Sequence, residues 1–322
     1  MSKIIVTGAA GFIGTNVVRS LNEQGIDDIV IVDELGSDEK WRNLTTLRYA
    51  EFLDLQDFRN LILHNEFSGE YDAVIHLGAC SSTTETDADY LADNNYQYSR
   101  DLCLWCLDYG IRFVYASSAA TYGNGSLGYS DDDSKTANYI PLNMYGYSKQ
   151  MFDMWVLRNG FFDQIVGLKY FNVFGPFEGH KGDMRSVVHK AFHQIQETGK
   201  VSLFKSYKSE YEDGGQVRDF IYVKDAVDVT IDFALNNKNS GLFNCGTGSS
   251  RSWLDLANAT FAAMGIKPNI DFIEMPEHLK GKYQYHTEAD PAKLRAAGYD
   301  KPFTSLEDGI RDYVQNYLME QK

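Results

Sequence analysis

The sequence predicts an α/β protein with a doubly wound parallel sheet and a smaller α/β region toward the C-terminus. Short β-branched runs, typical of buried parallel strands, recur along the first half of the chain. Segments of helical periodicity separate these runs, and a glycine-rich turn follows the first of them. Sheets of this kind bind ligands beyond the carboxyl ends of their strands. The residues that follow each strand are therefore the first candidates for a functional site.

The first strand and the turn after it predict a nucleotide site. The run Lys3–Thr7 leads into G-x-x-G-x-x-G from Gly8 to Gly14, and a helical pattern continues to Leu21. Glycines at this spacing let the backbone approach a pyrophosphate held at the helix N-terminus. The next strand, over 28–32, ends in Asp33, where a dinucleotide-binding fold places its ribose-binding acid. Together these features predict a Rossmann-type dinucleotide-binding region.

Further strands are expected over 48–53, 73–77, 112–116 and 164–171, and small or polar residues follow them. Ser118, just beyond the third of these strands, could hydrogen-bond a substrate hydroxyl. It could equally be an ordinary cap at the end of the strand.

Tyr145 and Lys149 are the clearest catalytic candidates. They lie four positions apart at the start of a predicted helix, so both side chains can point into one site. A phenol with a pKa near ~10 is a poor base at neutral pH, and an adjacent cation favours the phenolate. The pair therefore suits proton transfer, although Tyr-x-x-x-Lys also occurs by chance.

The pattern beyond residue 184 predicts the smaller region. Its expected elements are a helix over 184–196, a strand over 201–204, a polar stretch over 205–216, a strand over 218–223 and a helix from Asp225. A strand within 241–248 is expected to return to the first sheet. We therefore expect a dinucleotide-binding domain over 1–172, with a returning segment near 220–262, and a substrate-binding domain over 173–219 and 263–322.

Composition and charge narrow the function. Of 322 residues, 43% are hydrophobic and 23% are charged, as in soluble globular proteins, and the formal net charge of -15 disfavours a nucleic-acid partner. No apolar run reaches the roughly 20 residues of a membrane helix, and no secretory signal precedes the first strand, so we expect a cytoplasmic protein with no membrane partner. Cys103-x-x-Cys106 has helical apolar neighbours and no second ligand pair, so we expect buried thiols and no metal site.

Several of these segments also carry a family resemblance. The glycine run at 8–14, the segment Ser-Ala-Ala-Thr-Tyr-Gly at 118–123 and Tyr145-x-x-x-Lys149 resemble extended short-chain dehydrogenases/reductases of the epimerase/dehydratase type. More narrowly, the chain resembles the ADP-heptose 6-epimerases over nearly its whole length. The runs that carry this narrower resemblance lie at 78–85, 93–99, 116–123, 141–149, 170–176, 178–182 and 294–303.

The resemblance implies an epimerase that inverts carbon 6 of ADP-D-glycero-D-manno-heptose through a transient 6-keto intermediate, as a step toward lipopolysaccharide precursors. It implies retained NADP and a homo-oligomer, specifically a homopentamer. Tyr145 would be one acid/base, Lys149 its partner and ribose anchor, Ser118 the residue that orients the hydroxyl, and Lys181 a second acid/base. A second base has a physical reason, because a ketone that turns over between oxidation and reduction presents its oxygen to different protein atoms. A loop lysine such as Lys181 could otherwise simply be solvated.

The resemblance also implies two sets of binding residues. For the cofactor these are Gly8, Gly11, Phe12, Ile13, Gly14, Asp33, Glu34, Lys40, Leu77, Gly78, Ala79, Cys80, Ser81, Asn94, Lys149, Val173 and Lys181. For the substrate these are Asn172, Asp183, Lys190, Phe204, Lys205, Ser206, Tyr207, Arg218 and Tyr283.

Some positions depart from the subgroup's pattern. Glu34 follows Asp33, and Leu55 stands where a second lysine for a 2′-phosphate is expected, so NAD remains an alternative to NADP. Asp183 replaces a small hydroxyl residue. The fork of Arg218 suits a diphosphate, but a surface ion pair with Asp219 or Asp225 is the other interpretation.

Other activities can be weighed on the residues. A nucleotide-sugar dehydratase needs a carboxylic acid beside its serine or threonine, and Ala119-Ala120 offers none. A UDP-sugar 4-epimerase, or another nucleotide-sugar short-chain dehydrogenase/reductase, shares Ser118, Tyr145 and Lys149 but gives Lys181 no role. A non-catalytic cofactor-binding scaffold would not need to retain all three shared side chains.

Overall fold

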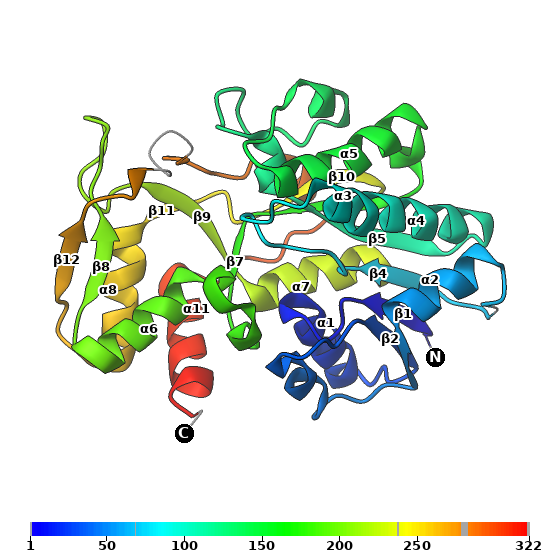
Figure 1. Ribbon diagram of the computed structural model, residues 1–322, viewed down its shortest axis with the longest axis horizontal. Coiled ribbons are helices and arrows are strands. Elements are labelled where there is room, and N and C mark those ends of the chain that lie inside the picture. Colours follow the sequence, from blue (N-terminus) through cyan, green and yellow to red (C-terminus); the bar gives the residue numbers. More distant parts are fainter. Residues whose placement is uncertain (1, 68, 237, 278–282, 321–322) are drawn as a thin grey trace.

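The computed structural model describes residues 2–67, 69–236, 238–277 and 283–320. Figure 1 shows a larger part around a central sheet and a smaller part that contains the C-terminal helix. Elements from the middle and the end of the chain both contribute to the smaller part.

The larger part contains a seven-stranded sheet of order β10-β6-β5-β4-β1-β2-β3. Every neighbouring pair of strands in it is parallel. The expected doubly wound parallel sheet is therefore confirmed. Its strands are β1 (Ile4–Thr7), β2 (Ile29–Asp33), β3 (Glu51–Asp54), β4 (Ala73–His76), β5 (Arg112–Ser118), β6 (Val166–Tyr170) and β10 (Gly241–Cys245).

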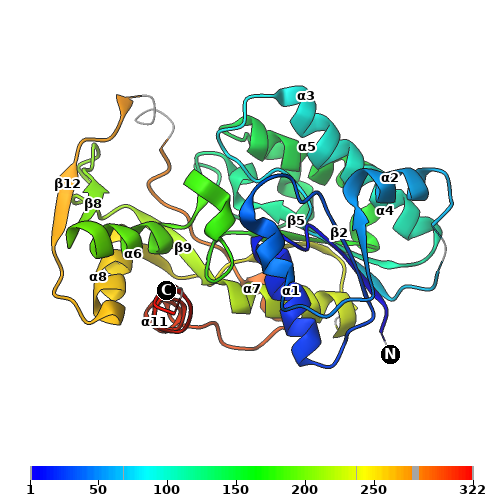
Figure 2. The same ribbon diagram turned by 60° about the horizontal axis from the view of Figure 1, so that its bottom comes forward.

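Helices cover both faces of this sheet (Figures 1 and 2). Successive residues of a strand point to opposite faces, so Ile4 and Val6 join one apolar cluster and Ile5 joins the other. The first cluster includes α1 (Phe12–Glu23) and α7 (Val223–Ile231). The second includes α2 (Leu55–Leu63), α4 (Tyr98–Asp108) and α5 (Met144–Arg158).

The order of the strands in the sheet reverses at β1. β1 lies between β2 and β4, so the crossovers on its two sides run to opposite faces of the sheet. In doubly wound sheets this point, beyond the carboxyl ends of the strands, is where ligands bind.

The smaller part has two small sheets and its own helices. β11-β9-β7 form one sheet, and β12 and β8 form the other. Their bounds are β7 (Asn172–Phe174), β8 (Val201–Phe204), β9 (Val217–Tyr222), β11 (Ser250–Ser252) and β12 (Ile270–Ile273). The accompanying helices are α6 (Val187–Thr198), α8 (Trp253–Met264) and α11 (Leu306–Tyr313). The short α3 (Ala88–Leu91) belongs to the larger part, and α10 (Ala292–Ala296) lies against β10, where Lys293 donates to the Leu242 carbonyl.

Two predicted boundaries differ from the structure. β3 begins at Glu51, because Arg48 is held outside the strand by hydrogen bonds to Asn22 and an ion pair with Asp27. α6 begins at Val187, because the Ser186 side chain accepts from the backbone of the first turn and caps the helix.

The returning strand is confirmed, since β10 pairs in parallel with β6. α7 packs in the same apolar cluster as α1. Residues of α8 are divided between that cluster and another that they share with α6 and β8.

Two smaller expectations concern membranes and cysteines. Within the described residues, no helix combines the length and apolar character needed to cross a bilayer. Cys103 and Cys106 are buried free thiols in the cluster around α4, so their predicted packing role is confirmed.

Candidate active site

A cavity of about 680 Å³ opens at the carboxyl ends of the central strands. Its walls come from the glycine-rich turn, the ends of β2, β4 and β5, the start of α5, and the segments after β6. All the residues predicted to act in catalysis or to bind the cofactor line it. Residues predicted from segments far apart in the chain therefore lie on the wall of one cavity.

The glycine turn forms a cradle that any side chain would fill. A Cβ on Gly14 would lie 2.0 Å from the Gly8 carbonyl oxygen, and a Cβ on Gly8 would lie 2.6 Å from the backbone nitrogen of Gly78. Gly8 also has φ +69°, in the left-handed region that favours glycine. The first turn of α1 also lines the cavity through Phe12, Ile13 and Gly14, so the residues present fit a dinucleotide pyrophosphate.

Asp33 at the end of β2 is fully engaged by protein donors. One carboxylate oxygen accepts from Ala10 N at 2.8 Å, and the other accepts from Glu34 N and from Lys40 Nζ, each at 2.8 Å. Lys40 comes from the turn η1 (Glu39–Leu44). Asp33, Glu34 and Lys40 all line the cavity near the end of β2.

Tyr145, Ser118 and Lys149 converge on the middle of the cavity. The first turn of α5 carries Tyr145, the end of β5 carries Ser118, and the Ser118 hydroxyl hydrogen-bonds the phenol. Lys149 is buried, and its Nζ donates to the Ala116 carbonyl at 3.0 Å. Asn143 caps α5 through Gly146 N, which fixes the turn on which Tyr145 stands.

Burial changes the ionisation of this pair. Burial raises the pKa of Tyr145, and the Ser118 hydrogen bond partly offsets the rise. Burial therefore works against the expected shift of the phenol toward neutral pH. Burial also lowers the pKa of Lys149 to about 8, while Asp153 opposes the fall.

Lys181 reaches the same cavity from the turn η6 (Gly179–Met184). Its ammonium lies 5.4 Å from the centre of the Phe12 ring, and burial lowers its pKa while Glu178 opposes the fall. The buried Glu178 carboxylate accepts from the Ser186 backbone and from its hydroxyl, which closes the loop that carries Lys181.

The predicted substrate residues divide into two groups. Asn172 lines the cavity, whereas the other eight lie outside its wall. Three of those eight form a cluster beside the cavity-lining Trp253. The Arg218 guanidinium lies 5.6 Å from the Trp253 ring and 5.2 Å from the Tyr283 ring, and the Phe204 ring is 6.5 Å from that of Tyr283.

Arg218 does not form the surface ion pair that was one of its two interpretations. It is buried, and its guanidinium donates to the carbonyl of Val217 at 2.8 Å and to that of Gln284. Asp219 binds the segment around Thr247, and Asp225 binds Thr304, so the expected surface ion pair is wrong. The sequence could not predict that backbone carbonyls would accept the hydrogen bonds of Arg218.

The remaining predicted substrate residues are on the surface of the smaller part. Lys190 donates to the backbone carbonyl of Asp183 at 2.6 Å. Lys205 pairs with Glu274 at 2.7 Å, and the Tyr207 hydroxyl contacts the same carboxylate. The backbone of Ser206 donates to Asp213 at 2.8 Å.

Sequence reasoning missed several residues at the cavity. Asn95 is buried, and its amide holds the backbone of Cys80 and donates to Ser148 next to Lys149. Arg185 lines the cavity, and its Nε is buried without a hydrogen-bond partner among the described residues. No sequence pattern around Asn95 or Arg185 indicated that these residues would lie at the cavity. Asp38, Leu55, Tyr90, His180 and Trp253 also line the cavity.

This sheet and these side chains define a class of enzyme that transfers a hydride and a proton on a substrate held against a dinucleotide. The model of the NAD dependent epimerase/dehydratase family matches residues 4–246, and the chain belongs to that family.

Relatives within the family are more specific. An ADP-L-glycero-D-manno-heptose-6-epimerase of Nitratidesulfovibrio vulgaris (strain Hildenborough) is 55% identical over 314 residues, which is 98% of this chain and 97% of the relative. One from Fusobacterium nucleatum is 49% identical over 99% of this chain and 98% of its own. The crystal structure of the Helicobacter pylori ADP-L-glycero-D-manno-heptose-6-epimerase matches with a TM-score of 0.82 at 27% identity, covering 98% of this chain and 96% of that one.

Proposed function

We propose that this protein inverts carbon 6 of ADP-D-glycero-D-manno-heptose to give the L-glycero epimer through a transient 6-keto intermediate. The observation that carries the proposal is 55% identity to an ADP-L-glycero-D-manno-heptose-6-epimerase over 98% of the chain. The position of Ser118, Tyr145, Lys149 and Lys181 on one cavity supports it.

A bound nicotinamide dinucleotide supplies the chemistry of hydride acceptance and return. In this proposal Tyr145 takes the proton of the 6-hydroxyl and Ser118 orients that hydroxyl through the hydrogen bond it already makes to the phenol. Lys149, charged below about pH 8, favours the phenolate that forms. Because burial raises the pKa of Tyr145, its phenol must lose its own proton to solvent before it can accept that of the hydroxyl, and a cationic Lys149 favours this loss.

Lys181 is the second acid/base in this proposal. After oxidation the ketone turns over, and its oxygen leaves Tyr145 for the opposite wall of the cavity. Lys181 lines the same cavity as Tyr145, and its lowered pKa brings an ammonium nearer to useful proton transfer, which supports this role.

We infer that the retained dinucleotide is NADP, with NAD as the alternative. Asp33 is already neutralised by Lys40, which leaves less acidic charge at the ribose end and a cation close to a 2′-phosphate. Glu34, exposed at the same end, is the feature that favours NAD. Mass spectrometry of the dinucleotide released from purified protein distinguishes the two.

The smaller part supplies the nucleotide end of the substrate in this proposal. Phe204, Tyr283 and Trp253 offer aromatic faces beside Arg218. Arg185 contributes positive charge for the diphosphate at the start of α6. We propose Asp183, Lys190, Lys205, Ser206 and Tyr207 as the outer contacts.

Two assays test the activity. Purified protein is incubated with ADP-D-glycero-D-manno-heptose and, separately, with a UDP-hexose, and the products are resolved chromatographically. Inversion of the heptose is expected. Epimerisation of the UDP-hexose at carbon 4 without inversion of the heptose would replace this proposal with a UDP-sugar 4-epimerase. The proposed homopentamer is tested separately by sedimentation equilibrium.

A further inference from the structure

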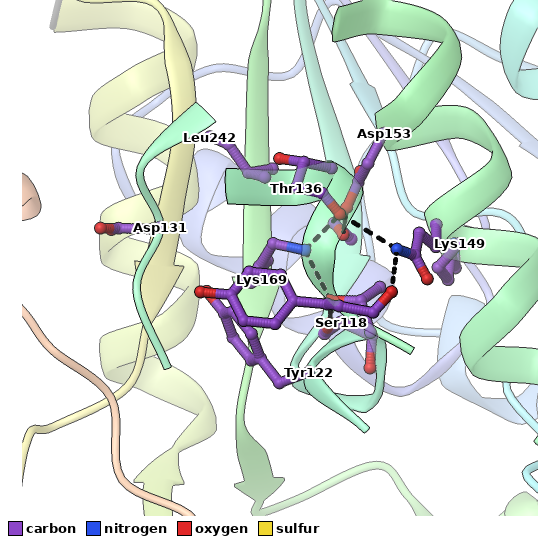
Figure 3. Close-up of polar contacts among 12 residues, drawn as sticks. Ser118, Tyr122, Asp131, Thr136, Lys149, Asp153, Lys169 and Leu242 are labelled. Atoms are coloured by element: carbon purple, nitrogen blue, oxygen red, sulfur yellow. Dashed lines mark hydrogen bonds and ion pairs between the residues drawn. The ribbon is translucent and has the colours of Figure 1, made fainter. Parts of the chain in front are cut away.

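A buried ion pair lies directly behind the proton-transfer groups. Asp153 of α5 accepts from Lys169 Nζ of β6 at 2.8 Å, and the two side chains are 0% and 1% exposed (Figure 3). Neither residue lines the cavity. Neither is among the residues predicted from the sequence.

The pair ties three elements together through a network of buried hydroxyls. Asp153 accepts from the Tyr115 hydroxyl at 2.8 Å and from the Ser117 hydroxyl at 2.7 Å, both on β5. Lys169 donates to the Thr121 hydroxyl at 2.5 Å, and that hydroxyl donates to the Ser118 carbonyl at 2.8 Å. The end of β5, where Ser118 stands, is thereby held to α5.

The helix places the carboxylate one turn beyond Lys149. Tyr145, Lys149 and Asp153 are spaced four residues apart on α5, so they lie along one face of the helix. Asp153 opposes the lowering of the Lys149 pKa by burial.

Other titratable groups face this cluster from each surrounding element. They are His76 of β4, Cys80 of the following loop, Cys103 of α4, Tyr115 of β5, Asp133 of η4 (Asp133–Asn138), Tyr145 of α5 and Lys169 of β6. His76 is neutral above about pH 3, and burial raises the pKa of Cys80. Asp153 therefore supplies negative charge near Lys149 at neutral pH.

Stability does not account for such a pair. Removing two charges from water costs several kcal/mol each, and apolar residues of similar volume are often at least as stabilising. A buried pair of this kind is better explained by what it positions.

We propose that the Asp153–Lys169 pair is a positioning device: it fixes Ser118 against α5 and keeps Lys149 in its cationic form. Neither residue touches the reacting atoms, so both act through Ser118, Lys149 and Tyr145. The proposal rests on the proposed function in taking these three side chains as the proton-transfer groups.

The test compares Asp153→Asn with the double variant Asp153→Asn/Lys169→Met in the full-length protein with its dinucleotide. The single variant leaves a buried cation unpaired and is expected to lose stability, which the double variant recovers. The double variant is nevertheless expected to lose activity about 10-fold and to shift the alkaline limb of its pH profile down by about one unit. Recovered stability with an unchanged pH profile would overturn the proposal and leave a merely structural pair.

Two further variants complete the test. Asp228→Asn breaks the exposed Lys301–Asp228 pair, whose side chains are 58% and 40% exposed, and is expected to change neither the activity nor the pH profile. Tyr115→Phe removes a single hydrogen bond to Asp153 and keeps both charges, so it covers the case in which the double variant does not fold. It is expected to lower kcat about 3-fold with KM unchanged, and an unchanged kcat would contradict the positioning role of the Asp153–Lys169 pair.

A spectroscopic readout separates this proposal from the substrate assignment. The Lys149 ammonium is titrated by nuclear magnetic resonance of protein labelled with ¹⁵N-lysine, and Lys149→Met assigns its signal. In the double variant Lys149 is expected to titrate at lower pH, because the Asp153 carboxylate no longer favours its charged form. This result holds even if an ADP-heptose is not the substrate, whereas an unmoved Lys149 titration would overturn the positioning role.

Discussion

The two ends of the cavity are built in different ways. The end proposed for the cofactor consists largely of backbone: the cradle of Gly8, Gly14 and Gly78 leaves no room for side chains, and Asp33 is held by three donors. The end proposed for the substrate consists of side chains carried by separate segments, such as Lys181 on η6 and Trp253 on α8.

This difference indicates which end tolerates change. Backbone atoms locked into a parallel sheet cannot move without breaking ladder hydrogen bonds. Loop side chains such as Lys205 can be exchanged at little cost to the fold, so substrate preference can vary there. The predictions below test this contrast.

The largest effect is expected at the cradle. Gly8 and Gly265 both have φ +69°, but a Cβ at Gly265 meets nothing within 4 Å. Gly265→Ala should therefore cost only the left-handed strain of about 1–2 kcal/mol. Gly8→Ala should add about 1–3 kcal/mol from overlap with Gly78 and should abolish dinucleotide binding. Urea denaturation measures the free energy of unfolding, and fluorescence titration measures dinucleotide binding. If the two variants lost equal stability and both still bound the dinucleotide, the predicted overlap at Gly8 would be wrong.

A change at the substrate end should affect chemistry without affecting the fold. Lys181→Met is expected to reduce inversion about 10²- to 10³-fold, because one proton-transfer group is lost. Dinucleotide content and melting temperature should stay unchanged. The exposed Lys301→Met is the control. Unchanged turnover in Lys181→Met would remove this residue from the mechanism.

Acid should lower the stability of the protein through the buried His76. This buried ring contacts Thr7 at 2.7 Å and Ser99 at 2.9 Å, and burial lowers its pKa from 6.5 to about 3. The folded state keeps it neutral while the unfolded chain binds a proton below 6.5, so stability falls as pH drops from 6.5 toward 3. The expected loss between pH 7 and pH 5 is about 2 kcal/mol. In urea denaturation, the free energy of unfolding of His76→Gln should depend less on pH than that of the unaltered protein. An equal dependence in the two proteins would show that His76 does not cause the loss of stability in acid.

The smallest effect on the fold is expected in the loop after β8. Lys205 and Glu274 form an exposed pair, with side chains 43% and 66% accessible. Lys205→Ala should change the free energy of unfolding by less than about 0.5 kcal/mol. If Lys205 contacts the substrate, KM should rise about 3-fold with kcat unchanged. A large fall in stability would show that this loop supports the fold after all.

Local pattern was sufficient for the larger part of the fold. The strands Ile4–Thr7, Ala73–His76 and Gly241–Cys245 are short apolar runs bounded by turn residues, and each was predicted within about two residues of its observed ends. β7, β11 and β12 were not predicted, because strands of three or four residues at the edge of a small sheet carry little periodicity. The cavity-lining residues could be predicted because glycine spacing and strand ends mark them locally.

The sequence by itself determined the parallel sheet, the glycine cradle and the Tyr145–Lys149 face of α5, since each depends on residues close together in the chain. Tertiary structure alone decided the partners of Arg218 and the pairing of Asp153 with Lys169. It also decided the raised pKa of Tyr145. These depend on which distant atoms surround a side chain and on how much water is excluded, and no local pattern encodes either.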